Sequence, residues 1–264
     1  MDLFAFSGDP ATAGRLVAAG VAGVVIDWER RGKRRRQAGA DTQIGTDAPD
    51  DLERVRAATP GRILCRVNGW GPRTPAEIEM AISLGADEVL LPMVRRPEEV
   101  DAALAAVAGR CHLGILVETD DAVHRVHELV WRPLSRVYVG LNDLMIDRRA
   151  SSVFAPLVDG TVDHVGHSVA AAGIPFGVAG LTLPEAGRPV PCALLIAALA
   201  RLDASFTFLR RSFHADMDGR HATVEVPRIL SALATARRRS VVEVDTDHRR
   251  LQALVGTETQ EEAV

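Results

Sequence analysis

The strongest constraint on the fold is an alternation of two kinds of segment that runs from one end of the chain to the other. Short apolar runs rich in β-branched residues alternate with longer Ala- and Leu-rich stretches that carry charged residues at helical spacing. Eight βα units in series predict an α/β protein with a closed (β/α)8 TIM barrel. The expected strands are Leu3–Phe6, Gly23–Asp27, Arg62–Asn68, Glu88–Val94, Leu113–Glu118, Arg136–Leu141, Pro175–Ala179 and Ser205–Leu209.

A doubly wound open sheet is the structural alternative to a barrel. Such a sheet normally has fewer strands and a glycine-rich phosphate loop after the first of them, and this sequence has neither feature. We therefore predict one catalytic barrel domain over residues 1–239, closed by a helix over Val226–Arg239. Residues 240–264 are polar and are expected to form a C-terminal helical extension that is in part disordered. Helix starts are predicted at Asp9-Pro10, Thr74-Pro75, Arg96-Pro97 and Thr119-Asp120.

Charge and cysteine content limit the partners and the compartment. The net charge of −4 gives no general attraction to nucleic acid or to an anionic membrane, so neither is expected as a partner. Cys65, Cys111 and Cys192 lie far apart in apolar runs, which favours reduced thiols. Met1–Phe6 has no basic leader, and no apolar run approaches the length of a membrane span. These features predict a cytoplasmic protein.

Polar side chains follow several of the predicted strands at their C-terminal ends, where TIM barrels place their chemistry. These residues are Asp27, Arg66, Glu118 and Asp143. Period-two alternation directs Arg66 and Glu118 into the barrel mouth. Carboxylates with an oxygen-only environment favour a hard cation, either Mg2+, Mn2+ or another divalent ion. The alternative is a structural ion network in which Arg66 bridges Glu118 and Asp143.

Five segments carry a resemblance to a known family. They are GVVIDWE at 23–29, RVNGWG at 66–71, GADEVLLPMV at 85–94, GILVET at 114–119 and VGLNDL at 139–144. In this order and spacing the chain resembles the HpcH/HpaI aldolase and citrate lyase β-subunit family. The resemblance implies a barrel of the phosphoenolpyruvate/pyruvate type and a divalent metal. It also implies a homo-oligomer, a trimer or a hexamer, built by exchange of a C-terminal helix.

The resemblance also assigns roles to residues. Glu118 and Asp143 match the metal-binding carboxylates, Arg66 matches the arginine that contacts the keto-acid oxygen, and Asp27 matches an acid on the second strand. The implied activity is that of a class II, metal-dependent carbon–carbon lyase or aldolase. Its implied substrates are a pyruvate- or oxaloacetate-like 2-keto acid, which reacts through a metal-stabilised enolate, and an aldehyde.

One departure from the family pattern leaves the base unassigned. The aldolases carry a histidine soon after the strand-two acid, where this chain reads Asp27-Trp28-Glu29-Arg30. Members of the citrate lyase type also lack it, so an acyl-CoA lyase or thioester hydrolase is the alternative function. A catalytically silent barrel is a third hypothesis, and the presence of all the charged mouth residues argues against it.

Several groups are candidates for moving the proton. We rank a water on the cation first, oriented by Asp27, and keep His214, which follows the last strand, as the reserve. A Schiff-base mechanism is not expected, because it needs a lysine inside the barrel and the only lysine, Lys33, lies in a loop.

Four further residues are candidates for substrate contacts: Glu29, Asn68, Trp70 and Gly180. Trp70 serves equally well as a residue that packs against its loop. The glycines of the GVAG segment at 177–180 can present N–H groups to a carboxylate or phosphate, or only allow a tight turn.

Two groups of basic side chains have simpler explanations. The basic run at 30–36 can receive an anionic substrate or the phosphates of CoA, but a solvated loop is the favoured interpretation. The histidine pairs His124/His127 and His164/His167 are expected to be surface or packing residues.

Overall fold

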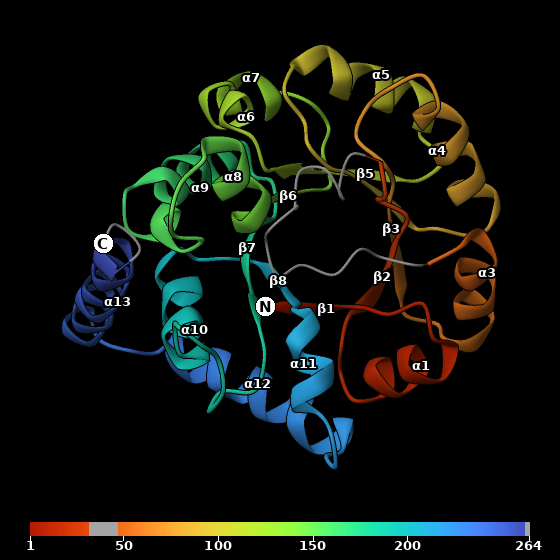
Figure 1. The fold of residues 1–264 in the computed structure, drawn as a ribbon. Coiled ribbons are helices and arrows are strands. Elements are labelled where there is room, and N and C mark those ends of the chain that lie inside the picture. The colour runs from red at the N-terminus through yellow and green to blue at the C-terminus, as the bar shows by residue number, and fades with distance from the viewer. Residues whose placement is uncertain (32–46, 262–264) are drawn as a thin grey trace.

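A computed structural model describes residues 1–31 and 47–261 and shows a closed, parallel, eight-stranded barrel inside a ring of helices (Figure 1). The strands follow one another around the barrel in chain order, and β1 closes the ring by pairing with β8. All eight predicted strands are confirmed, with ends that shift by a few residues. Their bounds are β1 Asp2–Phe6, β2 Gly23–Asp27, β3 Arg62–Arg66, β4 Glu88–Leu91, β5 His112–Val117, β6 Arg136–Val139, β7 Phe176–Leu181 and β8 Phe206–Leu209.

The helices begin where the sequence places their start signals. The Asp9 carboxylate accepts from the backbone N–H of Thr12 at 2.8 Å, and the Thr119 hydroxyl accepts from that of Ala122 at 3.1 Å. The helices are α1 Pro10–Ala18, α3 Pro49–Ala58, α4 Thr74–Ser83, α5 Pro97–Val107, α6 Asp120–His124, α7 Val126–Leu129, α8 Leu141–Arg148, α9 Thr161–Ala171, α10 Cys192–Arg201, α11 Arg211–Asp216, α12 Ala222–Ala236 and α13 Val241–Glu261, with a 3-10 turn, η1, at Ala155–Leu157.

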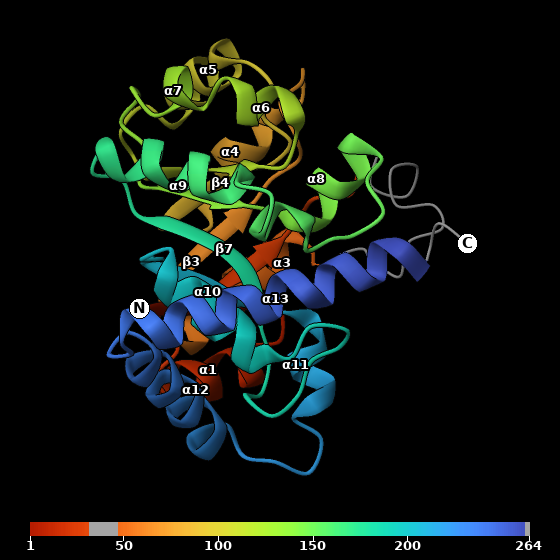
Figure 2. The ribbon, with the colours of Figure 1, turned by 90° about the vertical axis from the view of Figure 1, so that its left-hand side faces the viewer.

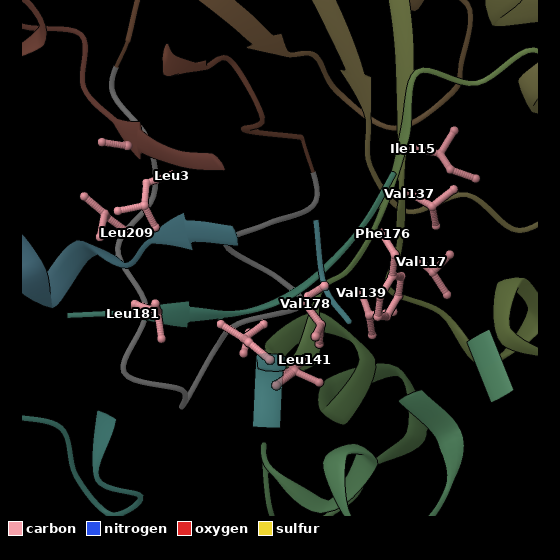
Figure 3. Packing of buried hydrophobic residues seen from close by; sticks show 14 of the residues in the cluster. Leu3, Ile115, Val117, Val137, Val139, Leu141, Phe176, Val178, Leu181 and Leu209 are labelled. Carbon is pink, nitrogen blue, oxygen red and sulfur yellow. The ribbon is translucent and has the colours of Figure 1, made fainter. Parts of the chain in front are cut away.

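Alternation along each strand divides the core into two layers. One face of each strand packs outward against the helices, as Val137, Val139 and Val178 do in Figure 3. The other face fills the barrel, so the strands are apolar on both faces and read as continuous hydrophobic runs. The barrel interior is formed by Phe4, Val25, Leu64, Leu90, Leu116, Phe206 and Phe208.

A buried ion pair lies at the N-terminal end of the barrel, opposite the predicted mouth. Arg136 opens β6 and its Nε donates to the Glu88 carboxylate of β4 at 2.7 Å. The guanidinium also stacks on Phe4, 4.5 Å from the ring centroid. Gly114 of β5 makes room for the pair, because a Cβ there would lie 2.7 Å from the Arg136 side chain and 2.8 Å from the Glu88 carboxylate.

The C-terminal segment forms the predicted helical extension. Val241–Glu261 forms the single helix α13, which lies against α10 (Figure 2) and buries Leu251 and Val255. The apolar stripe of this helix therefore has a partner surface, and partial disorder of the extension stays a prediction. The predicted closing helix exists as α12. Exchange of a C-terminal helix with a partner subunit stays a prediction, as does the homo-oligomer.

Other predictions concern single residues and the basic loop. All three cysteines are free thiols, as expected. Within the described part of the chain, no helix combines the length and apolarity that crossing a bilayer requires. Lys33 and the basic run from residue 32 onward lie outside the described residues.

Candidate active site

A cavity of about 590 Å3 opens at the C-terminal ends of the strands. Three of the predicted mouth residues, Arg66, Glu118 and Asp143, share its wall. Its volume lies within the range typical of pockets for small ligands. The wall is completed by residues on β6 and β7 and by residues that follow β7 and β8, among them Tyr138, Gly180, Arg188, Arg210 and Arg211.

Arg66 ends β3, and its guanidinium is held in place by a carboxylate on the neighbouring strand. Its Nε and Nη2 donate to the two oxygens of Asp27 at 2.9 and 2.8 Å, and its Nη1 lies 3.5 Å from Glu29. This fork-to-fork geometry fixes the plane of the guanidinium. Arg66 therefore pairs with Asp27 and Glu29 and does not bridge Glu118 and Asp143, which corrects the ion-network alternative.

Asp27 is buried between the guanidinium groups of Arg66 and Arg211. Its side chain is only 3% exposed, and Arg211 donates to its Oδ2 at 3.1 Å from the start of α11. With both oxygens engaged by guanidinium groups, Asp27 is built to position Arg66. It does not line the cavity, so the geometry does not favour the predicted orientation of a water by Asp27.

Glu118 follows β5 and is almost completely buried at the cavity wall. Burial, together with the negative charges of Asp143 and Glu29, raises its pKa to about 8, while Arg66 opposes the shift. The backbone N–H of Met93, a residue with φ of 56°, donates to Glu118 at 3.2 Å. A Cβ at Gly140 would lie 2.4 Å from the Glu118 side chain, so this position needs glycine.

Asp143 lies in the first turn of α8, which begins at Leu141 directly after β6. Its side chain is buried, and its charge is the largest electrostatic contribution to the raised pKa of Glu118. The structure therefore brings together the two carboxylates that the sequence singled out as cation ligands.

The raised pKa of Glu118 predicts a pH-dependent stability for the metal-free protein. Glu118 keeps its proton in the folded state up to about pH 8, whereas in the unfolded chain it loses the proton near its usual 4.5. Its stabilising contribution is complete below pH 4.5 and is lost as pH rises through about 8. Glu118→Gln cannot ionise, so its unfolding free energy does not carry this dependence on pH. Relative to the wild type, the variant should become more stable by about a few kcal/mol as the pH rises from 4.5 to about 8.

Urea denaturation of both proteins in chelator at pH 5, 6.5 and 8 measures this difference. A constant difference across the three pH values would contradict the shift.

Two of the predicted substrate contacts, Asn68 and Trp70, make their described contacts within the protein. Asn68 accepts from the backbone N–H groups of Arg30 and Arg31 and donates to the carbonyl of Trp28 and to Glu77, so its polar atoms hold the loops together. Trp70 packs against the outer core. Glu29 is buried beside Arg66, and Gly180 does line the cavity.

His214 is not brought to the cavity. It lies on α11, where its Nε2 is 2.8 Å from the carbonyl oxygen of Phe6, and it lines a separate hollow with Thr12 and Arg15. The turn into α11 directs its ring to the outside of the barrel. Among the other histidines, His124 and His167 each bond to the carbonyl four residues earlier, and the ring of His127 packs on that of His164.

Several cavity residues were missed by the sequence analysis. Tyr138 projects from β6, donates to the carbonyl of Ala179, and has a pKa raised above its usual value by burial and by the charge of Glu118. Arg210 and Arg211 follow β8 directly. Charged residues at the C-terminal end of a predicted strand were the criterion for the other mouth residues. The same criterion would have selected Arg210 and Arg211.

Buried carboxylates and a fixed arginine at the C-terminal mouth of a closed parallel barrel are the arrangement found in TIM-barrel enzymes. The sequence profile of the HpcH/HpaI aldolase/citrate lyase family matches residues 1–181. The chain belongs to this family. Because the family is one of aldolases and lyases, membership indicates an enzyme with a lyase function. No curated protein matched the chain by sequence.

Three solved structures share the fold of this chain. The HpcH/HpaI aldolase from Desulfitobacterium hafniense DCB-2 has 12% identity and a TM-score of 0.63, with 91% of this chain and 94% of that chain covered. A citrate lyase from Burkholderia xenovorans LB400 has 16% identity and a TM-score of 0.62, with coverage of 97% and 83%. The citrate synthase SbnG has 18% identity and a TM-score of 0.59, with coverage of 90% and 92%. At these identities the likeness concerns the fold.

Proposed function

We propose that this protein is a divalent-metal-dependent carbon–carbon lyase or aldolase that acts on a pyruvate- or oxaloacetate-like 2-keto acid. The observation that carries the proposal is the pair of buried carboxylates, Glu118 and Asp143, on the same cavity wall as the clamped guanidinium of Arg66.

The donor set fits a hard cation. Burial and the negative charge of Asp143 raise the pKa of Glu118, and a divalent ion held by both carboxylates would favour their ionised forms. Within the described residues, no cluster of three or more His, Cys, Asp or Glu side chains is arranged to hold a metal. Mg2+ commonly takes one or two carboxylates and completes its shell with water and substrate oxygens, so two are sufficient. When bound, the ion would supply Lewis-acid polarisation of the substrate.

The chain's own groups then account for orientation and charge stabilisation. Arg66 uses two of its five N–H donors on Asp27, and its remaining donors are available towards Glu29 and the cavity. As a bond to C3 breaks, negative charge develops on the C2 oxygen, and a guanidinium fixed beforehand stabilises it without reorganisation. The apolar wall, formed by Phe6, Leu116 and Phe208, limits water around the reacting carbon.

Hydrogen exchange at C3 of pyruvate tests this function without knowledge of the acceptor. In D2O with Mg2+ or Mn2+, the protein should exchange the methyl protons of pyruvate, as followed by 1H NMR. Excess chelator should reduce the exchange to the rate measured without protein. Glu79→Gln, an exposed carboxylate variant, is the control and should behave as the wild type. Undiminished exchange in chelator would refute the metal dependence.

The acyl-CoA alternative rests on the missing histidine after Asp27 and on the basic run at 30–36, most of which lies outside the described residues. It stays a prediction, and acetyl-CoA in place of pyruvate in the same exchange assay tests it.

A further inference from the structure

Two arginines on the cavity wall have no part in the proposed chemistry. Arg188 lies between β7 and α10, and Arg210 follows β8. Within residues 1–31 and 47–261, neither guanidinium makes a hydrogen bond or an ion pair, and the Nε of Arg210 is buried without an acceptor. Other arginines at this end of the barrel do have carboxylate partners, as Arg66 and Arg211 have Asp27.

The position of Arg210 is well determined by its surroundings. Its backbone N–H donates to the carbonyl of Leu181 at 2.8 Å, which holds it beside the end of β7. Two glycines leave space for its side chain. A Cβ at Gly180 would lie 3.0 Å from the Cβ of Arg210, and one at Gly187 would lie 3.2 Å from its Nη2. The Nε of this side chain is buried without an acceptor, and such a donor is costly unless a ligand supplies one.

Charge is divided between the walls of the cavity. The carboxylates Glu118 and Asp143 come from β5 and α8, whereas Arg188 and Arg210 come from the segments that follow β7 and β8. A molecule that fills the cavity therefore meets cation-binding carboxylates through one part and guanidinium groups through another. Guanidinium groups recognise carboxylate and phosphate oxygens through their paired N–H donors.

We propose that Arg188 and Arg210 form a second oxyanion subsite, which binds a carboxylate or phosphate group on the substrate remote from the 2-keto acid unit. The inference rests on the proposed function and narrows its substrate class to 2-keto acids that carry a second anionic group. Both arginines lie beyond residue 181, where the match to the family profile ends.

Binding of three ligands with the same pyruvate unit tests the subsite. Pyruvate has no second anion, 2-oxoglutarate adds a carboxylate, and 3-phosphonopyruvate adds a phosphonate. Isothermal titration calorimetry with Mg2+ should show at least about tenfold tighter binding of one or both two-anion ligands than of pyruvate. The ligand that gains more tells whether the subsite prefers carboxylate or phosphate.

Variants of the two arginines test whether they cause the tighter binding of the two-anion ligands. Arg210→Gln and Arg188→Gln should each remove most of it and leave pyruvate binding unchanged, and Arg210→Lys should retain part. Arg54→Gln on α3, which removes the same charge from an exposed position, should leave it intact. Thermal unfolding of each variant establishes that it is folded.

The outcomes separate this inference from the proposed function. Equal affinities for all three ligands in the wild type, no binding of any of them, or a preference that survives both glutamine variants would overturn the subsite. Equal affinities and a preference that survives both glutamine variants have no bearing on pyruvate exchange in D2O. Absence of binding by every ligand, pyruvate included, would count against the proposed function as well. Conversely, loss of metal-dependent exchange together with an intact preference would overturn the proposed function and leave the subsite in place.

Discussion

Arg66→Met is expected to lower the rate of pyruvate C3 exchange by about a hundredfold to a thousandfold, the usual effect of removing one fixed donor to a developing oxyanion. The same change removes the main cation beside Asp27 and Glu29, both of which are buried. Leaving buried carboxylates without their partner typically costs about 3–5 kcal/mol. The single variant should therefore lose stability as well as activity.

A second substitution separates the two effects. In Arg66→Met/Asp27→Asn, the carboxylate that Arg66 neutralises is also uncharged, so most of the lost stability should return while exchange stays low. Arg66→Lys keeps the positive charge but cannot engage both oxygens of Asp27, so its rate should lie between those of the wild type and Arg66→Met. Stability is measured by urea denaturation and exchange by 1H NMR. Near-normal exchange in the double variant would show that Arg66 stabilises the fold and has no part in the exchange reaction.

Glu88→Gln is expected to destabilise the barrel by about 3–5 kcal/mol, because it leaves the buried guanidinium of Arg136 without its carboxylate. Ser135 also donates to Glu88 at 2.6 Å, so more than one contact is weakened. Since the pair lies at the opposite end of the barrel from the cavity, the exchange rate per folded molecule should stay close to that of the wild type.

The matched control for Glu88→Gln is an exposed ion pair. Arg132 binds Asp101 at 2.7 Å, but the Asp101 side chain is 56% exposed. Asp101→Asn should therefore cost less than about 1 kcal/mol. Urea denaturation compares the two variants. Equal effects from Glu88→Gln and Asp101→Asn would mean that burial does not increase the contribution of the inner pair.

The sequence alone predicted the barrel and four residues of the cavity wall, Arg66, Glu118, Asp143 and Gly180. Strands buried on both faces must be apolar throughout, so a charge at the end of such a run is conspicuous, as it is at Arg66 and Glu118. Their inward direction follows from period-two alternation. The helix starts also follow from local signals, because a cap such as Asp9 or Thr119 satisfies N–H groups only a few residues away.

Tertiary structure decided what these side chains do. Asp27 meets Arg211, 184 residues later in the chain, only because the barrel closes and brings the end of β8 near β2. Whether a residue after a strand faces the cavity depends on the course of its loop, which directs Arg210 inward and His214 outward. Helix α13 similarly required the surface of α10 before its apolar stripe had a partner. Strand patterns are local properties of the chain, whereas loop direction and side-chain pairing depend on contacts between distant segments.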